Sequence, residues 1–216
     1  MPEFGYIAVE GIDSSGKTEL AKFLAERYDA SLILDETHHN PFLKDFYVNP
    51  AQSAFSAQIF FLLSRYQQLK ELNQPDLFER RKVADFIFAR DGLLARLNLN
   101  QREYGLYQSL SKLMEAEIPI PDLVIYLQTS AAVAWEKIKK RKNSLPTNLT
   151  LNYLENLSQA FDRYFFHYRQ SPLLIVNANS LDLFDNKSDL ELIWAEIPKT
   201  TFGTRYFAPV SKDVLL

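Results

Sequence analysis

The chain has 216 residues, of which 47% are hydrophobic and 24% are charged, and its formal net charge is -3 at pH 7. This is the composition of one globular domain and excludes a disordered chain, and the acidic balance argues against a nucleic-acid partner. The chain has no cysteine, which excludes disulfide scaffolds, cysteine zinc sites and thiolate nucleophiles. No apolar run approaches the roughly 20 residues of a membrane span, so we expect a cytoplasmic protein with no membrane partner.

Short apolar segments alternate along the chain with segments of helical periodicity. The predicted strands are, in order, Tyr6–Val9, Ser31–Leu34, Lys82–Ala84, Leu123–Leu127 and Leu173–Val176. The predicted helices are Lys17–Tyr28, an amphipathic helix from Phe55 to Leu69, Leu93–Leu113, Ser130–Arg141, Leu154–Tyr168 and Leu190–Ile197. This alternation predicts βαβ units in one α/β domain, with a parallel sheet covered by helices on both faces. Residues from about 200 to 216 show no clear period and are expected to form an extended tail.

The segment after the first predicted strand matches a phosphate-binding loop. It fits G-x-x-x-x-G-K-[ST] and reads Gly11-Ile12-Asp13-Ser14-Ser15-Gly16-Lys17-Thr18. The glycines permit a turn whose backbone N–H groups converge on a phosphate, and the following helix directs its positive N-terminus at the same anion. Lys17 is expected to reach the β- and γ-phosphates, and the Thr18 hydroxyl to bind Mg²⁺. The loop predicts nucleoside triphosphate binding, but it does not identify the phosphate acceptor, which is water or a small molecule.

Two further motifs suggest other functions, and both are disfavoured. Residues Asn186–Asp189 spell N-K-S-D, which resembles a guanine-binding motif. That motif should follow a buried strand directly, whereas the last predicted strand ends at Val176, ten residues earlier. The adjacent His38 and His39 suggest a metal site, but neighbouring residues rarely converge on one ion and no third ligand is evident.

Polar residues beside the predicted elements are candidates for the acceptor side. Glu36 follows the second strand directly, where ligands bind to parallel sheets, and a carboxylate there can accept a proton from a hydroxyl. Gln58 and Arg65 are seven residues apart and share one helical face, from which they can contact a nucleobase edge. Asp85 ends the third strand and can hold Mg²⁺ or its waters, and Asp91 follows six residues later. For each of them the alternative is an ordinary solvated side chain.

A basic helix end precedes a polar segment in the second half of the chain. Lys137–Lys142 contains five basic residues in six, and Lys137, Lys140 and Arg141 share a helical face. The arrangement predicts a lid at about residues 137–150 whose cations close over transferring phosphates. The alternative is a solvated helix end that complements the helix dipole.

The order and spacing of several motifs resemble the deoxyribonucleoside kinase family, and within it the short bacterial deoxyadenosine/deoxyguanosine kinase branch. The resemblance covers roughly residues 5–207 and begins with the phosphate loop. It continues with E-x-x-x-N-P-F-L at 36–43, DFY at 45–47, QIFFLLSRY at 58–66, PDLVIYLQ at 121–128, YLE at 153–155, residues 165–168, SPLLIVN at 171–177 and residues 203–209. It implies a three-layer P-loop kinase fold with a five-stranded parallel sheet, helices on both faces and a basic lid.

The resemblance also implies ATP-dependent phosphorylation of the 5′-hydroxyl of a 2′-deoxynucleoside. Carried over by position, Glu36 is the base on that hydroxyl and Tyr47 holds the sugar 3′-hydroxyl. Gln58 reads the nucleobase edge, with Arg65 and Asp91 completing the same polar network. The branch favours purine deoxynucleosides, and family members are commonly dimers, so we expect a homodimer.

On the phosphate side, the resemblance assigns Lys17 a catalytic role and places Thr18 and Asp85 near Mg²⁺. Lys137 and Arg141 become the lid cations that bind ATP, and Arg141 is counted among the catalytic residues. Residues 1–216 then form a single kinase domain.

The chain departs from the family in ways that affect the phosphate side. The animal branch has Glu-Arg-Ser where this chain has Asp85-Phe86-Ile87, so an arginine near the phosphates is missing. The lid has Lys137 and Asn143 in place of arginines, and Pro146 stands where the family usually places an acid. Two alternatives follow: a nucleoside monophosphate or other small-molecule kinase, and a nucleotide-binding regulatory protein without turnover.

Overall fold

The computed structural model of the protein describes residues 4–73, 81–141 and 149–209. Its centre is a six-stranded sheet in the order β2-β3-β1-β4-β5-β6, and every neighbouring pair of strands runs parallel. The strands are β1 (Tyr6–Gly11), β2 (Ser31–Ile33), β3 (Lys82–Ala84), β4 (Leu123–Gln128), β5 (Leu173–Asn177) and β6 (Thr204–Phe207). The five predicted strands are confirmed.

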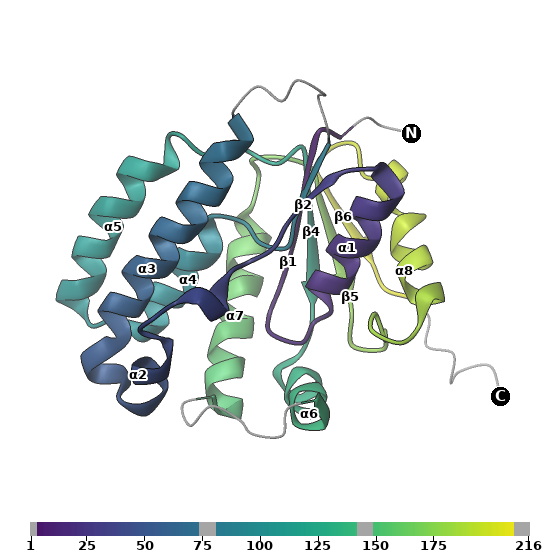
Figure 1. Ribbon diagram of the computed structural model, residues 1–216. Coiled ribbons are helices and arrows are strands. Elements are labelled where there is room, and N and C mark those ends of the chain that lie inside the picture. Colours follow the sequence, from purple (N-terminus) through teal and green to yellow (C-terminus); the bar gives the residue numbers. More distant parts are fainter. Residues whose placement is uncertain (1–3, 74–80, 142–148, 210–216) are drawn as a thin grey trace.

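Helices cover both faces of the sheet, as Figure 1 shows. They are α1 (Lys17–Tyr28), α2 (Leu43–Val48), α3 (Pro50–Lys70), α4 (Ala89–Asn98), α5 (Gln101–Glu115), α6 (Ala131–Arg141), α7 (Leu151–His167) and α8 (Lys187–Trp194). One buried cluster joins the sheet to α1 and α8, and a second joins the other face to α4 and α7. This is the predicted three-layer α/β fold. Among the described residues, no helix combines the length and the apolar character that a bilayer crossing requires.

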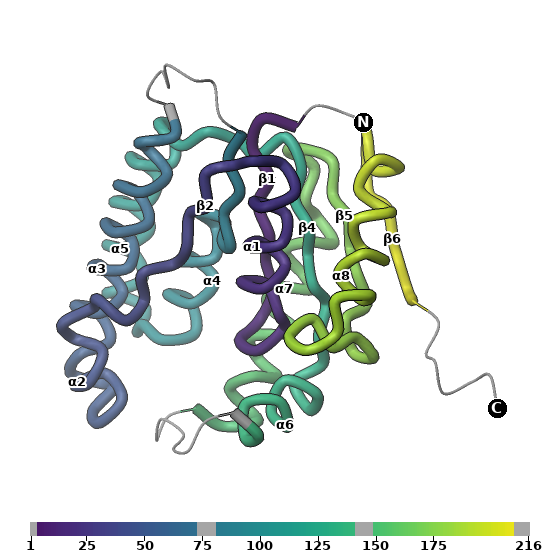
Figure 2. The backbone as a smooth tube through the Cα atoms, turned by 45° about the vertical axis from the view of Figure 1, so that its right-hand side comes forward, coloured from purple at the N-terminus to yellow at the C-terminus, as the bar shows by residue number. Residues whose placement is uncertain are grey.

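The sheet has one strand more than the five that were predicted. The sixth strand, β6, lies in the segment expected to be an extended tail, and it pairs with β5 from Leu173↔Thr204 to Val176↔Phe207. Figure 2 shows β6 at the edge of the sheet. Its residues alternate between exposed and half-buried, so the strand carries no apolar run that would reveal it in the sequence.

Two helical segments also differ from the sequence prediction. The helix predicted over Leu93–Leu113 is two helices, because Asn100 begins a new one. Its side chain accepts hydrogen bonds from the backbone N–H groups of Arg102 and Glu103, and the Asn100 N–H donates one to the Glu103 side chain. Helix α2 was not predicted; it is six residues long and buries none of its side chains completely.

The strand order places a crevice at the end of β1. The chain leaves β1 through α1 toward β2 on one side, whereas the next strand on the other side of β1 is β4. Ligands of open parallel sheets bind at such a switch point, beyond the carboxyl ends of the strands. The loop Gly11–Thr18 begins there, and the ends of β2 and β3 lie beside it.

Candidate active site

The phosphate loop has the backbone that an anion site requires. Gly16 adopts a left-handed φ of 93°, and a Cβ on it would lie 2.7 Å from the Leu183 Cβ. A Cβ on Gly11 would lie 2.5 Å from the Ser15 Oγ, so both positions exclude a side chain. Helix α1 begins at Lys17, and no described side chain caps its first turn. The first N–H groups of the helix therefore remain available to a phosphate.

Side chains of the phosphate loop contact Asp85, which follows β3. The Thr18 Oγ1 donates a hydrogen bond to the Asp85 Oδ2 at 2.5 Å, and the Lys17 Nζ lies 3.8 Å from the same oxygen. Asp85 is buried, and its Oδ1 accepts a hydrogen bond from the Asp35 backbone N–H at 2.8 Å. A hydroxyl and a carboxylate beside a phosphate loop are hard oxygen donors of the kind that Mg²⁺ takes together with phosphate oxygens. The residues present therefore fit the ion.

A cavity lies next to this pair of oxygens, enclosed by α2, α3, α4 and α7. It extends from Asp13 in the phosphate loop to residues deep in the helical layer, and its lining includes Tyr47, Gln58, Arg65 and Arg90. Burial raises the pKa of the half-buried Tyr47 hydroxyl, with a further contribution from the nearby Asp13 charge. The sequence-predicted substrate residues Tyr47, Gln58 and Arg65 thus lie around one cavity beside the phosphate loop.

The inner end of the cavity is a buried polar network centred on Asp91. The Asp91 Oδ1 accepts hydrogen bonds from the Gln58 Nε2 at 2.6 Å and the Arg65 Nη1 at 2.5 Å. The Asp91 Oδ2 accepts one from the Tyr107 hydroxyl at 2.7 Å. Complete burial raises the pKa of Asp91 to about 6, although Arg65, Tyr107 and Gln58 act to lower it. The network orients the Gln58 amide, which also lies 3.5 Å from the Asn98 Nδ2.

Arg65 connects this network to Asp35 at the end of β2. Its Nη2 donates to the Asp35 Oδ2 at 2.9 Å, and the Arg90 Nε lies 3.8 Å from the same oxygen. Burial alone would raise the pKa of Asp35, but the guanidinium groups of Arg65 and Arg90 outweigh it and lower the pKa to about 2. Asp35 is therefore a largely buried, ionised carboxylate that lies between the Asp91 network and Asp85.

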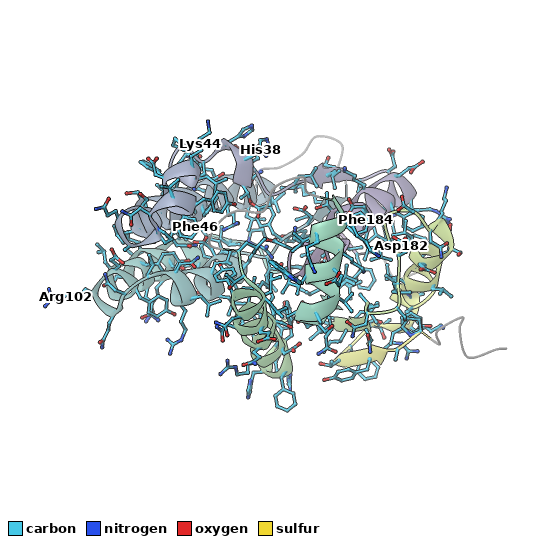
Figure 3. The ribbon with its side chains drawn as sticks, turned by 90° about the horizontal axis from the view of Figure 1, so that it is seen from below. His38, Lys44, Phe46, Arg102, Asp182 and Phe184 are labelled. Atoms are coloured by element: carbon cyan, nitrogen blue, oxygen red, sulfur yellow. The ribbon has the colours of Figure 1, made fainter. Side chains whose placement is uncertain are left out.

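Glu36, the predicted base, lies outside this cluster. Its side chain is 47% exposed, and its partner is His39, whose Nδ1 is 3.4 Å from the Glu36 Oε2. It lines a separate surface hollow together with Asp35, His38 and Glu71. Figure 3 shows His38 directed outward on the side of β2 and α2. The described residues contain no group of three or more potential metal-ligating side chains.

Asp35, Arg90 and Tyr107 belong to the site and were missed by the sequence reasoning. Arg90 donates to the buried Glu10 and, at 3.0 Å, to the Gly11 carbonyl oxygen. Tyr107 holds Asp91 from α5. The one signal for Arg90 was its position directly after the apolar segment 86–89 and before Asp91, since an arginine there must find buried partners. Nothing in the local pattern distinguishes Tyr107 from an ordinary core tyrosine.

The predicted lid is described only in part. The Lys137 Nζ donates to the Leu181 carbonyl oxygen at 3.0 Å, which ties α6 to the loop before α8. Leu183 in the same loop contacts Gly16, and Figure 3 shows its neighbours Asp182 and Phe184 on the side of α8. The Arg141 side chain and residues 142–148, with Asn143 and Pro146, lie outside the described part of the chain.

A larger hollow elsewhere lacks the chemistry of this cavity. It lies between α4 and α7, and its lining includes Leu93, Leu97, Arg163 and Tyr164. Neither the phosphate loop nor the buried carboxylates contribute to it. We therefore assign the active site to the smaller cavity beside the phosphate loop.

Comparisons with known proteins show the family of the chain. The profile of the deoxynucleoside kinase family matches residues 7–202. The chain is 28% identical to the deoxyguanosine kinase of Bacillus subtilis (strain 168), over 89% of this chain and 95% of that protein. It is 29% identical to the deoxyadenosine kinase of Dictyostelium discoideum, over 94% of this chain and 84% of that protein.

The solved structure of a deoxyadenosine kinase from M. mycoides with bound dCTP has the same fold. The TM-score is 0.75 at 24% identity, and the match covers 90% of this chain and 99% of that chain. Together with a family profile that spans nearly the whole chain, the phosphate loop and the adjoining polar cavity lead to one conclusion: the chain belongs to the deoxynucleoside kinase family.

Proposed function

We propose that the protein transfers the γ-phosphoryl group of ATP to the 5′-hydroxyl of a 2′-deoxynucleoside, with purines favoured. The observation that carries this proposal is the continuous polar chain from Asp91 through Arg65 to Asp35, which ends beside Asp85 and the phosphate loop. A nucleoside in this cavity would place its base against Gln58 and its sugar near Tyr47. Its 5′-oxygen would then face the loop.

Asp35 is the better placed of the two neighbouring carboxylates to accept the hydroxyl proton. Its side chain is only 10% exposed and pairs with the two cavity arginines, and its backbone N–H donates to Asp85. Glu36, which the family resemblance implies as the base, has a side chain that is 47% exposed and lies beside His39. In either case the carboxylate orients the attacking oxygen and takes its proton as the P–O bond forms.

The remaining residues serve the phosphates. Lys17 and the N–H groups of the loop would hold the β- and γ-phosphates, and Lys137 and Arg141 would approach them from the lid side. Thr18 and Asp85 would hold Mg²⁺, which supplies neutralising charge to the triphosphate. The short contact between the Thr18 hydroxyl and the Asp85 carboxylate supports this assignment.

The purine preference rests on the relatives. Those with substantial coverage include a deoxyguanosine kinase and a deoxyadenosine kinase, although another B. subtilis relative is a deoxyadenosine/deoxycytidine kinase. A nucleoside monophosphate acceptor is less well supported, because it needs early arginines to hold its phosphate. Arg27 pairs with Glu191 between α1 and α8, and Arg65 pairs with two buried carboxylates.

We also propose that the protein is a cytoplasmic homodimer. Members of the family commonly pair long helices, and α5 leaves Leu106 and Leu113 exposed on its surface. A second copy covering such leucines would remove apolar surface from water. Sedimentation equilibrium measures the mass in solution, and a mass of one chain would contradict the dimer.

An ATP-consumption screen tests the proposed reaction. Purified protein is incubated with ATP, Mg²⁺ and each of the four deoxynucleosides, each of their monophosphates, or water alone. We expect consumption with deoxynucleosides, fastest with the purines, and a 5′-monophosphate as product. Consumption only with monophosphates would support the alternative kinase, and no consumption with any acceptor would support a regulatory protein.

A further inference from the structure

Arg90 is a buried arginine that both lines the cavity and contacts the phosphate loop. Its side chain is 5% exposed, and it lines the cavity although it belongs to the first turn of α4. One nitrogen, Nη1, contacts Glu10 and the Gly11 carbonyl oxygen at the end of β1. The second, Nη2, lies 3.3 Å from the Asp13 Oδ1 in the phosphate loop. The guanidinium therefore bridges the strand that leads into the loop and the loop itself.

The third nitrogen of Arg90 has no partner among the described residues. Its Nε is buried and donates no hydrogen bond, and the closest carboxylate oxygen recorded, the Asp35 Oδ2, is 3.8 Å away. That distance is too long for a hydrogen bond. A buried N–H group without an acceptor costs free energy. Native proteins therefore contain few such groups, and a ligand or a water molecule usually accepts the hydrogen bond. Arg90 lines the cavity, and its Nε is 3.8 Å from Asp35, the proposed base.

Charge balance alone does not account for this arrangement. Burial raises the pKa of Glu10, whereas the Arg90 charge acts to lower it, so the pair does compensate a buried carboxylate. A lysine could supply the same charge to Glu10, but only the planar fork of an arginine also spans Gly11, Asp13 and the space beside Asp35. The position where relatives in the animal branch carry an arginine holds Phe86, which is completely buried in the core. It presents no cation to the site.

We propose that Arg90 is a further catalytic residue. Its Nε–H donates a hydrogen bond to the 5′-oxygen of the acceptor, and this hydrogen bond persists when that oxygen becomes the ester oxygen of the product. This role rests on the proposed function. The acceptor O–H bond breaks and its proton passes to a carboxylate at the end of β2. A new bond forms between that oxygen and the γ-phosphorus as the bond to the β–γ bridging oxygen breaks, and ADP leaves. Arg90 stabilises the charge on the transferring group and keeps it in line with the loop.

The variant Arg90→Lys tests this role, since lysine keeps the charge beside Glu10 but lacks the Nε–H and the fork. We expect kcat to fall by about 100-fold or more, as for the loss of other transition-state donors. The dissociation constant for ATP, measured by equilibrium dialysis, and the melting temperature should stay close to those of the wild type. Arg96→Lys, an exposed position on the same helix, is the matched control and should keep wild-type kcat.

Two kinetic results would overturn the proposal. One is a kcat of Arg90→Lys within about threefold of the wild type. The other is a fall in kcat that is matched by an equal loss of ATP affinity, because Arg90 would then only shape the phosphate loop. If wild-type protein phosphorylates no deoxynucleoside, the proposed function fails, and this role fails with it. If the wild type turns over normally and Arg90→Lys has the same kcat, the role of Arg90 is overturned but the proposed function stands.

A crystal structure of the wild-type protein with deoxyguanosine, the β,γ-imido analogue of ATP and Mg²⁺ provides a test that does not depend on the folding of a variant. The Arg90 Nε should lie within about 3.2 Å of the 5′-oxygen or of a γ-phosphate oxygen. An Nε that donates to a protein carbonyl, or that faces no ligand atom, would contradict the proposal.

Discussion

Arg65 donates to Asp35 through one nitrogen and to Asp91 through another, at 2.9 and 2.5 Å. One buried guanidinium thereby connects the carboxylate at the end of β2 with the network that holds Gln58. Under the proposed function, this side chain, which is 2% exposed, would couple nucleobase recognition to the orientation of the attacking hydroxyl. A substitution at Asp35 or at Asp91 should therefore affect the position of the other carboxylate through Arg65.

The first prediction separates the two carboxylates at the end of β2. We expect Asp35→Asn to lower kcat by about 10²- to 10⁴-fold, because the hydroxyl loses the group that orients it and takes its proton. Glu36→Gln, at the exposed neighbouring position, is the matched variant and should change kcat little. Steady-state kinetics with the preferred deoxynucleoside measures both. The opposite ranking would restore Glu36 as the base that the family resemblance implies.

The second prediction concerns nucleoside recognition. Gln58→Ala removes the amide that faces the base and leaves Asp91 short of one hydrogen-bond donor. A lost hydrogen bond with a buried partner costs roughly 1–3 kcal/mol, so we expect KM for the nucleoside to rise by about 10- to 100-fold, with little change in KM for ATP. Gln67→Ala, an exposed position on the same helix, is the control. An unchanged nucleoside KM would show that Gln58 does not contact the substrate.

The third prediction is a pH dependence of stability. Because folding lowers the pKa of Asp35 from 3.8 to about 2, the ionised group stabilises the fold above about pH 4, and this contribution is lost as the pH falls toward 2. Its size is on the order of 2 kcal/mol. The difference in unfolding free energy between the wild type and Asp35→Asn should therefore shrink as the pH falls from about 4 to about 2. Urea denaturation followed by circular dichroism measures it, and a constant difference would contradict the ion pairs.

The fourth prediction compares two glycines. Gly16→Ala forces a side chain into a left-handed turn and against Leu183, so it should abolish ATP binding and lower the melting temperature. Gly105, in the exposed middle of α5, has no atom within 4 Å of an added Cβ. Gly105→Ala should stabilise the fold by about 0.5–1 kcal/mol without affecting turnover. Isothermal titration with ATP and thermal unfolding measure the two effects; ATP binding by Gly16→Ala would contradict the anion-site geometry.

Much of the fold was determined by features that are local in the sequence. The buried strands β1, β4 and β5 are nearly continuous apolar runs, and parallel strands covered on both faces need such runs. The phosphate loop was equally predictable, because its glycines, lysine and threonine act through a short backbone turn. Strand β6 could not be predicted, because it depends on pairing with β5. The helix break at Asn100 could not be predicted either, because the cap interrupts a continuous helical pattern.

The acceptor side of the site was decided by the tertiary structure. Asp35 and Glu36 are neighbours with the same charge, and only the packing of β2 against β3 and α3 directs one toward Arg65 and leaves the other in solvent. Arg90 and Tyr107 reach Asp13 and Asp91 from helices distant in the chain, and no local pattern records such contacts. The sequence alone could identify which chemical groups are present near the strand ends. Which of them meet in the cavity depends on long-range packing, because burial and distance to a partner are properties of the folded chain.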